Sequence, residues 1–260
     1  MILQNQLIKS IYNNKKTGNK SFAVLIDPDK TDEKECLRII EKSIHKVDYF
    51  FVGGSLITGD KLNDIVLFLK EHSNIPVILF PGSSLHVTPN ADAILFLSLI
   101  SGRNPDLLIG QHVIAAPLIK KSKVEVLPTG YILIDGGKPT TVSYMSNTFP
   151  IPADKPEVAA CTALAGELLG LQLIYLDAGS GAIQSVSPEM IESVKKMISL
   201  PIIVGGGINS TEKALKAWEA GADVIVIGNA IESNTSLIDE ITFCKEKLNT
   251  KIAHSVKVLT

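Results

Sequence analysis

The sequence has few cysteines and no excess of charge of either sign. Its three cysteines, Cys36, Cys161 and Cys244, are odd in number and widely spaced, so they fit neither a disulfide framework nor zinc-ligand spacing. A reducing cytoplasm is the simplest expected location. Lysine and arginine total 25 against 27 aspartates and glutamates. This balance provides no basic face of the kind that binds nucleic acid, and we expect no such partner.

Long apolar runs are also missing. A run such as AILFL (93–97) is far shorter than the roughly 20 residues of a membrane span. Gln, Asn and Lys interrupt the opening MILQNQLIKSIYNNKK, which therefore has no signal-peptide core. We expect a soluble protein with at most peripheral membrane contact. Apolar residues at helical spacing predict instead a short amphipathic helix packed on the body: Leu3, Leu7, Ile8, Ile11 and Tyr12.

Eight short, continuous apolar runs dominate the rest of the chain, as expected for strands that are covered on both faces. They are FAVLID (22–27), YFFVGG (49–54), PVILFP (76–81), AILFLS (93–98), YILIDG (131–136), LIYLDA (173–178), PIIVGG (201–206) and VIVIGN (224–229). Helical patterns separate most of them, at 31–47, 59–73, 155–170, 187–199 and 210–221. The first of these opens on a Thr31 cap, and the last closes on Gly221 as a C-cap.

This alternation over 260 residues predicts a single (β/α)8 barrel domain spanning residues 1–260. A doubly wound open sheet is the structural alternative, but no G-x-G-x-x-G loop follows the first strand. One interval breaks the rhythm, because residues 82–92 (GSSLHVTPNAD) contain Gly82 and Pro89 and almost no helical period. We predict a TIM barrel without a full helix between strands three and four. The apolar flank left open there is either covered by a loop or a partner subunit, or is a groove for a long apolar ligand.

Glycine-bearing turns end the last three strands. They are Ala178-Gly179-Ser180-Gly181, Gly206-Gly207 and Gly228-Asn229. Barrels of this kind commonly bind phosphate at the final βα loops, where glycine lets backbone N–H groups approach an anion. No Lys or Arg lies within residues 175–181, 205–207 or 228–229, so we predict a phosphate site made of backbone amides.

Asp177 ends the sixth strand directly before its glycine turn. A carboxylate beside a phosphate suits a ligand with hydroxyl groups, because it accepts their hydrogen bonds and can remove a proton. Tyr175 lies two residues earlier, on the same face of the strand, and could reach the same ligand.

Asp27 ends the first strand in the sequence Asp27-Pro28-Asp29-Lys30. An acid at this position could hold Mg2+, with Ser55 and Thr58 after strand two as hydroxyl ligands. The alternative is a turn or capping residue ahead of Pro28. We expect Asp29 to face solvent.

Three other residues are candidates with ordinary alternatives. His86 could touch a ligand at the mouth of the site or lie on the surface. Asp135, after the fifth strand, is either a second catalytic acid or part of a plain turn. Cys161 lies on a helix of small residues, and we expect it in the core.

Taken together, LIDPDK (25–30), FVGGS (51–55), YLDAGSG (175–181), VGGGI (204–208) and IGN (227–229) make the chain resemble the geranylgeranylglyceryl phosphate synthase family over nearly its whole length. These prenyltransferases include the bacterial heptaprenylglyceryl phosphate synthases. Their fold is a modified TIM barrel that lacks the helix after strand three. The resemblance implies that sn-glycerol 1-phosphate is joined to a polyprenyl diphosphate, geranylgeranyl diphosphate above all, with release of pyrophosphate, in ether phospholipid biosynthesis.

The resemblance also implies roles for individual residues. Asp27 and Ser55 would bind Mg2+, and Asp177 would take a proton from the glycerol hydroxyl. The groove beside strands three and four would hold the prenyl chain. The residues expected to hold glycerol phosphate are Tyr175, Leu176, Asp177, Ala178, Gly179, Ser180, Gly181, Gly206, Gly207, Gly228 and Asn229.

Two positions depart from the family pattern. Many relatives have Glu in place of Asp177, and some have Lys in place of Leu25. The second departure favours a subgroup that includes archaeal and Bacteroidetes members.

We also expect a homo-oligomer, because of the open barrel flank. The rival prediction is a phosphate-binding isomerase with Asp27 and Asp135 as its acid and base.

Overall fold

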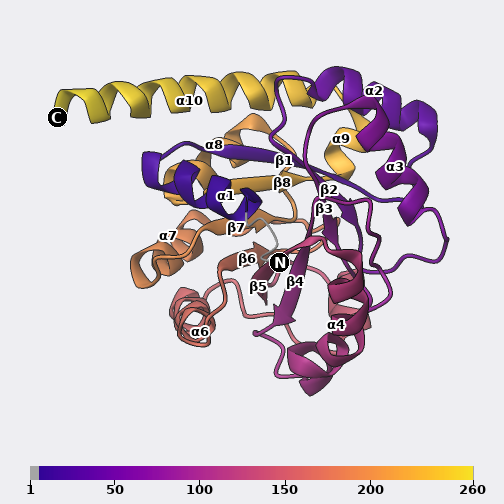
Figure 1. Cartoon of the computed structure of the whole chain (residues 1–260). Coiled ribbons are helices and arrows are strands. Elements are labelled where there is room, and N and C mark those ends of the chain that lie inside the picture. Colours follow the sequence, from indigo (N-terminus) through magenta and orange to yellow (C-terminus); the bar gives the residue numbers. More distant parts are fainter. Residues whose placement is uncertain (1–5, 260) are drawn as a thin grey trace.

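Eight parallel strands close into a barrel in the order β1 to β8, each strand pairing with its neighbours in sequence and β1 with β8. The computed structural model describes residues 6–259, and Figure 1 shows the barrel with its surrounding helices. The strands are β1 (Ser21–Ile26), β2 (Tyr49–Gly53), β3 (Val77–Phe80), β4 (Ala93–Leu99), β5 (Glu125–Leu133), β6 (Leu173–Asp177), β7 (Ile202–Gly205) and β8 (Val224–Ile227). The predicted (β/α)8 fold is confirmed.

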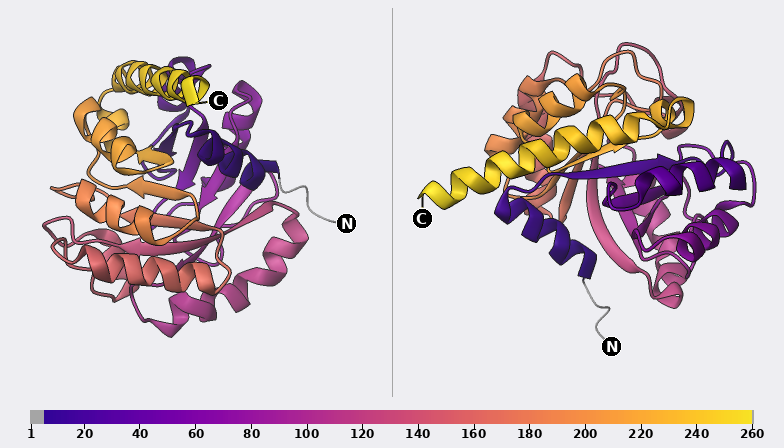
Figure 2. Two further views of the ribbon diagram at one scale, coloured as in Figure 1. Left: turned by 90° about the vertical axis from the view of Figure 1, so that its left-hand side faces the viewer. Right: turned by 90° about the horizontal axis from the view of Figure 1, so that it is seen from above.

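Helices cover most of the barrel's outer surface. They are α1 (Gln6–Thr17), α2 (Glu33–Ser43), α3 (Leu62–His72), the short π-helix η1 (Asp106–Gly110), α4 (Gln111–Ser122), α5 (Thr141–Ser146), α6 (Pro156–Leu168), α7 (Pro188–Met197), α8 (Thr211–Ala220), α9 (Asn229–Ser233) and α10 (Leu237–Leu259). The last part of α10 extends beyond its neighbours (Figure 2). No helix of the described residues is long and apolar enough to cross a membrane.

Two local predictions need correction. The N-cap of α2 is Asp32 rather than Thr31, because Asp32 and Glu35 form a reciprocal capping box. Strand β5 begins at Glu125, upstream of the predicted start at Tyr131. The apolar pattern missed this beginning because Pro128 interrupts it, yet Pro128 pairs with Phe96 of β4. The predicted cap of α8 at Gly221 is confirmed.

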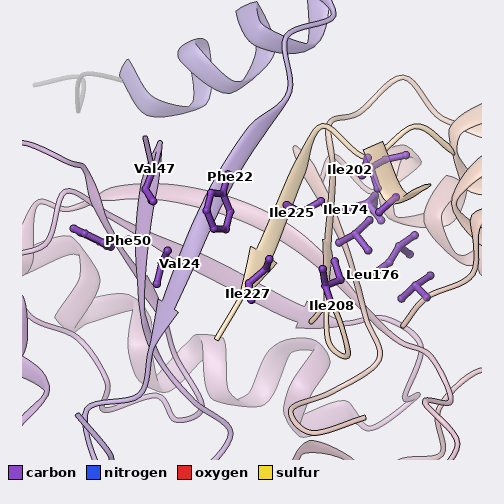
Figure 3. Packing of buried hydrophobic residues seen from close by; sticks show 14 of the residues in the cluster. Phe22, Val24, Val47, Phe50, Ile174, Leu176, Ile202, Ile208, Ile225 and Ile227 are labelled. Carbon is purple, nitrogen blue, oxygen red and sulfur yellow. The ribbon is translucent and has the colours of Figure 1, made fainter. Parts of the chain in front are cut away.

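The alternating strand residues form two apolar layers. One layer fills the space between strands and helices, and Figure 3 shows side chains of it on β1, β6 and β8, among them Phe22, Ile174 and Ile225. Each such fully buried side chain contributes about 1.5–3 kcal/mol relative to an exposed one. Cys161 is not part of this layer, because its side of α6 is exposed. The prediction that Cys161 lies in the core is therefore wrong.

The second layer fills the barrel itself, and α1 closes it from one end through Ile8 and Ile11. The predicted N-terminal helix is thus confirmed from Gln6 onward, while Leu3 lies outside the described residues. The carboxylate of Glu125, at the start of β5, accepts the N–H groups of Gln6, Leu7 and Ile8 at 2.8–3.0 Å. These bonds satisfy the free donors that begin a helix and fix α1 to the barrel.

Residues 82–92 form no helix, so β3 is followed directly by a loop and β4, as predicted. The outward side chains of β4 are only partly covered, with Phe96 and Ser98 half-buried. The missing helix leaves room beside β4 that is bounded on its far side by α4.

Candidate active site

Asp177 ends β6 inside the barrel and is almost fully buried, with 6% of its surface exposed. Its Oδ2 accepts a hydrogen bond from the Tyr131 hydroxyl. Its Oδ1 accepts the backbone N–H of Gly179 at 2.8 Å. Tyr131 and Tyr175 are paired residues on β5 and β6, and their rings meet edge to face with centroids 5.4 Å apart. Two donors therefore hold the carboxylate, which lies on the inner side of the barrel with the packed rings of Tyr131 and Tyr175.

Burial raises the pKa of Asp177, because the charged form loses its hydration, while the hydrogen bonds from Tyr131 and Gly179 partly offset the rise. The pKa values of Tyr131 and Tyr175 are raised well above 10 by burial and by the charge of Asp177. Both tyrosines are therefore neutral donors at physiological pH. A carboxylate with a raised pKa is a better proton acceptor than one in water, provided that it stays ionised.

The glycine turns of β6 and β7 meet beside Asp177. Gly206 has φ +80°, and a Cβ on it would lie 2.6 Å from Asp177 Oδ1 and from the Gly179 nitrogen. Only glycine fits both the conformation and the contact. Among residues 6–259, the N–H groups of Ser180, Gly181, Gly206 and Gly207 find no acceptor within the protein. Such converging free donors are suited to an anion.

The turn after β8 completes this edge. Ser180 and Asn229 are exposed and hydrogen-bond to each other, with Asn229 Nδ2 donating to Ser180 Oγ at 3.1 Å. The short helix α9 begins directly after Gly228. On α8, Lys213 Nζ donates to the Gly207 carbonyl at 2.9 Å and so holds the β7 turn in place. The structure thus brings the predicted glycine turns together.

Two residues of the predicted set face elsewhere. The side chains of Leu176 and Ala178 are buried in the outer layer between strands and helices. The Ala178 N–H donates to the Gly205 carbonyl at 3.1 Å. These two residues therefore contribute backbone to the end of β6 and its turn. Their side chains do not reach a ligand inside the barrel.

Asp27 lies on the rim, directly after β1. Its Oδ2 is 2.8 Å from the Lys30 ammonium, and its Oδ1 accepts the Asp29 N–H at 3.1 Å. A Cβ on Gly54 would lie 3.7 Å from Asp27 Oδ2, which puts the start of the Ser55 loop next to this carboxylate. Asp29 is exposed, as predicted. It also binds the Thr58 hydroxyl at 2.9 Å, so Thr58 has a partner other than a metal.

Glu232 lies beside this group, and no sequence pattern singled it out. Burial raises the pKa of Glu232, and the Lys30 charge opposes the rise. Lys30 in turn has its pKa raised by its hydrogen bond to Asp27. Within residues 6–259, no three His, Cys, Asp or Glu residues gather into a metal-binding group. A cation here would depend on one carboxylate, hydroxyl groups and oxygens supplied by a ligand.

A cavity of about 630 Å3 opens beside β4, where the helix is missing. Apolar side chains of β4, α4 and the 82–92 loop form most of its wall, including Ile94, Phe96, Val87, Ala115 and Ile119. Ser55, which follows the Gly54 that lies next to Asp27, and Tyr131 also line this cavity. The volume falls within the range of ligand pockets. The open flank that the sequence predicted is therefore a groove.

Tyr131 is the functional residue that the sequence did not reveal. Its ring lines the groove, while its hydroxyl binds Asp177. One signal was available in the sequence. Tyr131 begins the run YILIDG, and an inward residue on the fifth strand lies next to the inward residues of the sixth strand, which include Asp177. His112 was also missed. It lines the groove from α4, and its Nε2 lies 3.0 Å from Ser98 Oγ.

The remaining candidate residues are His86 and Asp135. His86 lines the groove and accepts the Gly82 N–H at 3.3 Å, and burial lowers its pKa. Asp135 is exposed, and its Oδ1 accepts the N–H of Gly137 at 2.9 Å. That bond is typical of a turn-forming aspartate.

Known proteins share this architecture. Over 93% of this chain and 97% of its own length, a geranylgeranylglyceryl phosphate synthase of Spirosoma linguale is 54% identical. The synthase of Thermococcus gammatolerans is 46% identical over 84% of this chain and 86% of its own length. The crystal structure of the Thermoplasma acidophilum synthase with its substrate sn-glycerol-1-phosphate covers 93% of this chain and 98% of its own, with a TM-score of 0.87 and 32% identity.

These relatives come from Bacteroidetes and from archaea, in agreement with the predicted subgroup. A family match extends over residues 14–245, which include every strand and all the glycine turns. The predicted family resemblance is confirmed, and the chain belongs to the PcrB family.

Proposed function

We propose that this protein joins sn-glycerol 1-phosphate to a polyprenyl diphosphate through an ether bond and releases pyrophosphate. One observation carries the proposal: Tyr131 lines the apolar groove and also hydrogen-bonds to Asp177, which lies beside the free N–H groups of the glycine turns. A long apolar substrate and a small phosphorylated alcohol can therefore meet at one carboxylate. The relatives named geranylgeranylglyceryl phosphate synthase support the same reaction.

The phosphate of sn-glycerol 1-phosphate would bind at the turns of β6, β7 and β8. The N–H groups of Ser180, Gly181, Gly206 and Gly207, which have no acceptor among the described residues, support this assignment. The Thermoplasma acidophilum synthase, which has the same fold, was crystallised in complex with this substrate, and this adds further support. The glycerol hydroxyl groups would then extend toward Asp177 and Tyr175.

Asp177 would be the proton acceptor. The 3-hydroxyl oxygen of the glycerol attacks C1 of the prenyl chain as the bond from C1 to the diphosphate oxygen breaks. The hydroxyl proton passes to the carboxylate, and the bonding pair leaves with pyrophosphate. The bonds from Tyr131 and Gly179 hold the carboxylate in one orientation. Closing the groove with an apolar chain would keep water from the allylic carbon.

Mg2+ is part of the proposal, with Asp27 and Ser55 as its protein ligands. The donor set fits, because Mg2+ commonly uses one or two carboxylates together with substrate phosphate oxygens and water. When bound, it would neutralise charge on the departing pyrophosphate. Lys30 pairs with the same Asp27 oxygen and is 55% exposed. Asp27 itself is only 18% exposed, so Lys30 could turn to a pyrophosphate oxygen once Mg2+ takes its place beside that carboxylate.

The prenyl chain would lie in the groove beside β4. Its apolar wall supports this, since each CH2 that leaves water contributes about 0.8 kcal/mol. Ile94 and Ile119 lie at the end away from the strand tips, because β4 runs toward the rim and α4 runs back. That end would limit chain length, and geranylgeranyl diphosphate is the substrate we expect.

The test is transfer of labelled sn-glycerol 1-phosphate into an organic-extractable product, with C15 to C35 diphosphates and Mg2+. We expect product and pyrophosphate in equal amounts, and much poorer turnover of sn-glycerol 3-phosphate. If no prenyl diphosphate carries the label into the organic phase, the proposed function is wrong.

The isomerase alternative has little support. Asp27 and Asp135 follow β1 and β5, which are not neighbours in the closed strand order, and Asp27 is paired with Lys30. Asp135 is exposed and binds within its own turn. An isomerase would also have no need of the apolar groove.

Association between copies of the chain is a further part of the proposal. Three apolar residues close together in the chain, Tyr144, Met145 and Phe149, are 84%, 50% and 94% exposed, and a contiguous apolar patch marks an interaction site. Light scattering after size exclusion would detect a dimer or larger assembly.

A further inference from the structure

Lys138 lies next to the phosphate-binding turn of β6, although it comes from the loop after β5. A Cβ built on Gly181 would lie 3.8 Å from the Lys138 ammonium. The side chain is exposed, and within residues 6–259 it forms no ion pair and no hydrogen bond. An unpaired cation therefore lies beside a turn whose Ser180 and Gly181 N–H groups also have no protein acceptor.

Backbone bonds fix this proximity. The carbonyl of Gly136 accepts the N–H groups of Ile183 and Gln184 at 3.0 and 3.1 Å. A Cβ on Gly179 would lie 2.7 Å from the Thr140 hydroxyl. The loop that carries Lys138 is therefore joined to the β6 turn on both sides of the lysine. The backbone of Lys138 is therefore held beside this turn by the fold.

Backbone amides alone leave part of a phosphate dianion uncompensated. The donors are neutral, and the closest carboxylate, Asp177, has the same sign as the ligand. Lys213 on the neighbouring helix is committed to the Gly207 carbonyl. Among the described residues, Lys138 is the cation that the structure brings to the β6 turn without another partner.

We propose that Lys138 binds the phosphate group of sn-glycerol 1-phosphate and is a determinant of affinity for that substrate. The inference rests on the proposed glycerol phosphate site and adds a residue from outside the glycine turns. The ammonium acts as a point charge, so another cation of similar reach can replace it.

The experiment compares Lys138→Gln and Lys138→Arg with wild type. Lys196→Gln is the matched control, because Lys196 is 78% exposed and lies at the far end of α7. Calorimetry gives Kd for inorganic phosphate and for sn-glycerol 1-phosphate, and steady-state kinetics gives KM for both substrates. We expect Lys138→Gln to raise Kd and KM for sn-glycerol 1-phosphate roughly tenfold, equivalent to about 1.4 kcal/mol.

The same variant should leave KM for the prenyl diphosphate unchanged, and Lys138→Arg should restore most of the affinity. The difference between wild type and Lys138→Gln should shrink as salt is raised, since the charge is exposed. Equal affinity of the two proteins for phosphate and sn-glycerol 1-phosphate overturns the inference, and so does a change confined to the prenyl diphosphate.

Failure of the proposed function looks different from failure of the inference. In the first case, wild type itself does not bind sn-glycerol 1-phosphate, and the titration with inorganic phosphate still decides the role of Lys138. In the second case, wild type binds and turns over both substrates, and Lys138→Gln behaves as Lys196→Gln does.

Discussion

Replacing Asp177 with Asn tests the proposed chemistry most directly. Asn has the same shape, so its Oδ1 can still accept the Gly179 N–H and fit beside Gly206. It cannot take a proton, and its Nδ2 replaces the oxygen that accepts the Tyr131 hydroxyl. A positioned general base contributes about 10²–10⁴ in rate, so kcat should fall by that factor, or about 2.7–5.4 kcal/mol in activation free energy.

The assay is single-turnover ether formation with labelled sn-glycerol 1-phosphate, combined with calorimetric binding of the same ligand. Affinity should change by less than about threefold, because backbone N–H groups hold the phosphate. Asp135→Asn is the matched control, since it alters an exposed carboxylate just beyond the neighbouring strand. An Asp177→Asn variant that keeps the wild-type kcat would refute the reasoning.

The raised pKa of Asp177 adds a pH dependence whose sign is fixed. The base must be ionised, so wild-type activity should fall as pH drops through a value above the ordinary 3.8, and the residual activity of Asp177→Asn should lack this limb. For stability, a carboxyl whose folded pKa is raised contributes fully below its unfolded pKa, and this contribution is lost as pH rises through the folded pKa. Thermal denaturation should therefore show the stability of wild type, relative to that of Asp177→Asn, rising as pH falls from neutral toward 4.

The other predictions concern the metal, the phosphate turn and the groove. Asp27→Ala should abolish Mg2+-dependent turnover with an unchanged circular dichroism spectrum, and full activity would remove Asp27 from the metal site. Gly206→Ala should cost about 1–2 kcal/mol of stability from its positive φ, and the contact with Asp177 should also weaken sn-glycerol 1-phosphate binding. Gly170→Ala is the control, because Gly170 also has a positive φ of +87° but a Cβ there would meet nothing within 4 Å. It should lose stability without losing affinity for sn-glycerol 1-phosphate, so equal affinity of the two variants would contradict the argument. Ala115→Phe should shift preference toward shorter prenyl diphosphates, whereas Val113→Phe, at an exposed position of α4, should not; an unchanged preference would show that the chain lies elsewhere.

Much of the fold follows from local patterns. The eight apolar runs predicted eight strands because a strand covered on both faces needs continuous apolar residues. Residues 82–92 predicted the missing helix because they contain Gly82 and Pro89 and have almost no helical period. Strand β5 was misplaced because Pro128 interrupts its apolar pattern, although neighbouring strands supply the pairing that keeps it in the barrel.

The sequence by itself determined the succession of strands along the chain, the glycine turns and the two acids at strand ends, since each depends on residues close together in the chain. Tertiary structure decided what those residues touch. The Tyr131–Asp177 bond, the approach of Lys138 to Gly181 and the wall that α4 gives the groove all join segments far apart in sequence. Such contacts exist only once the barrel closes, because closure sets which strand ends and loops become neighbours.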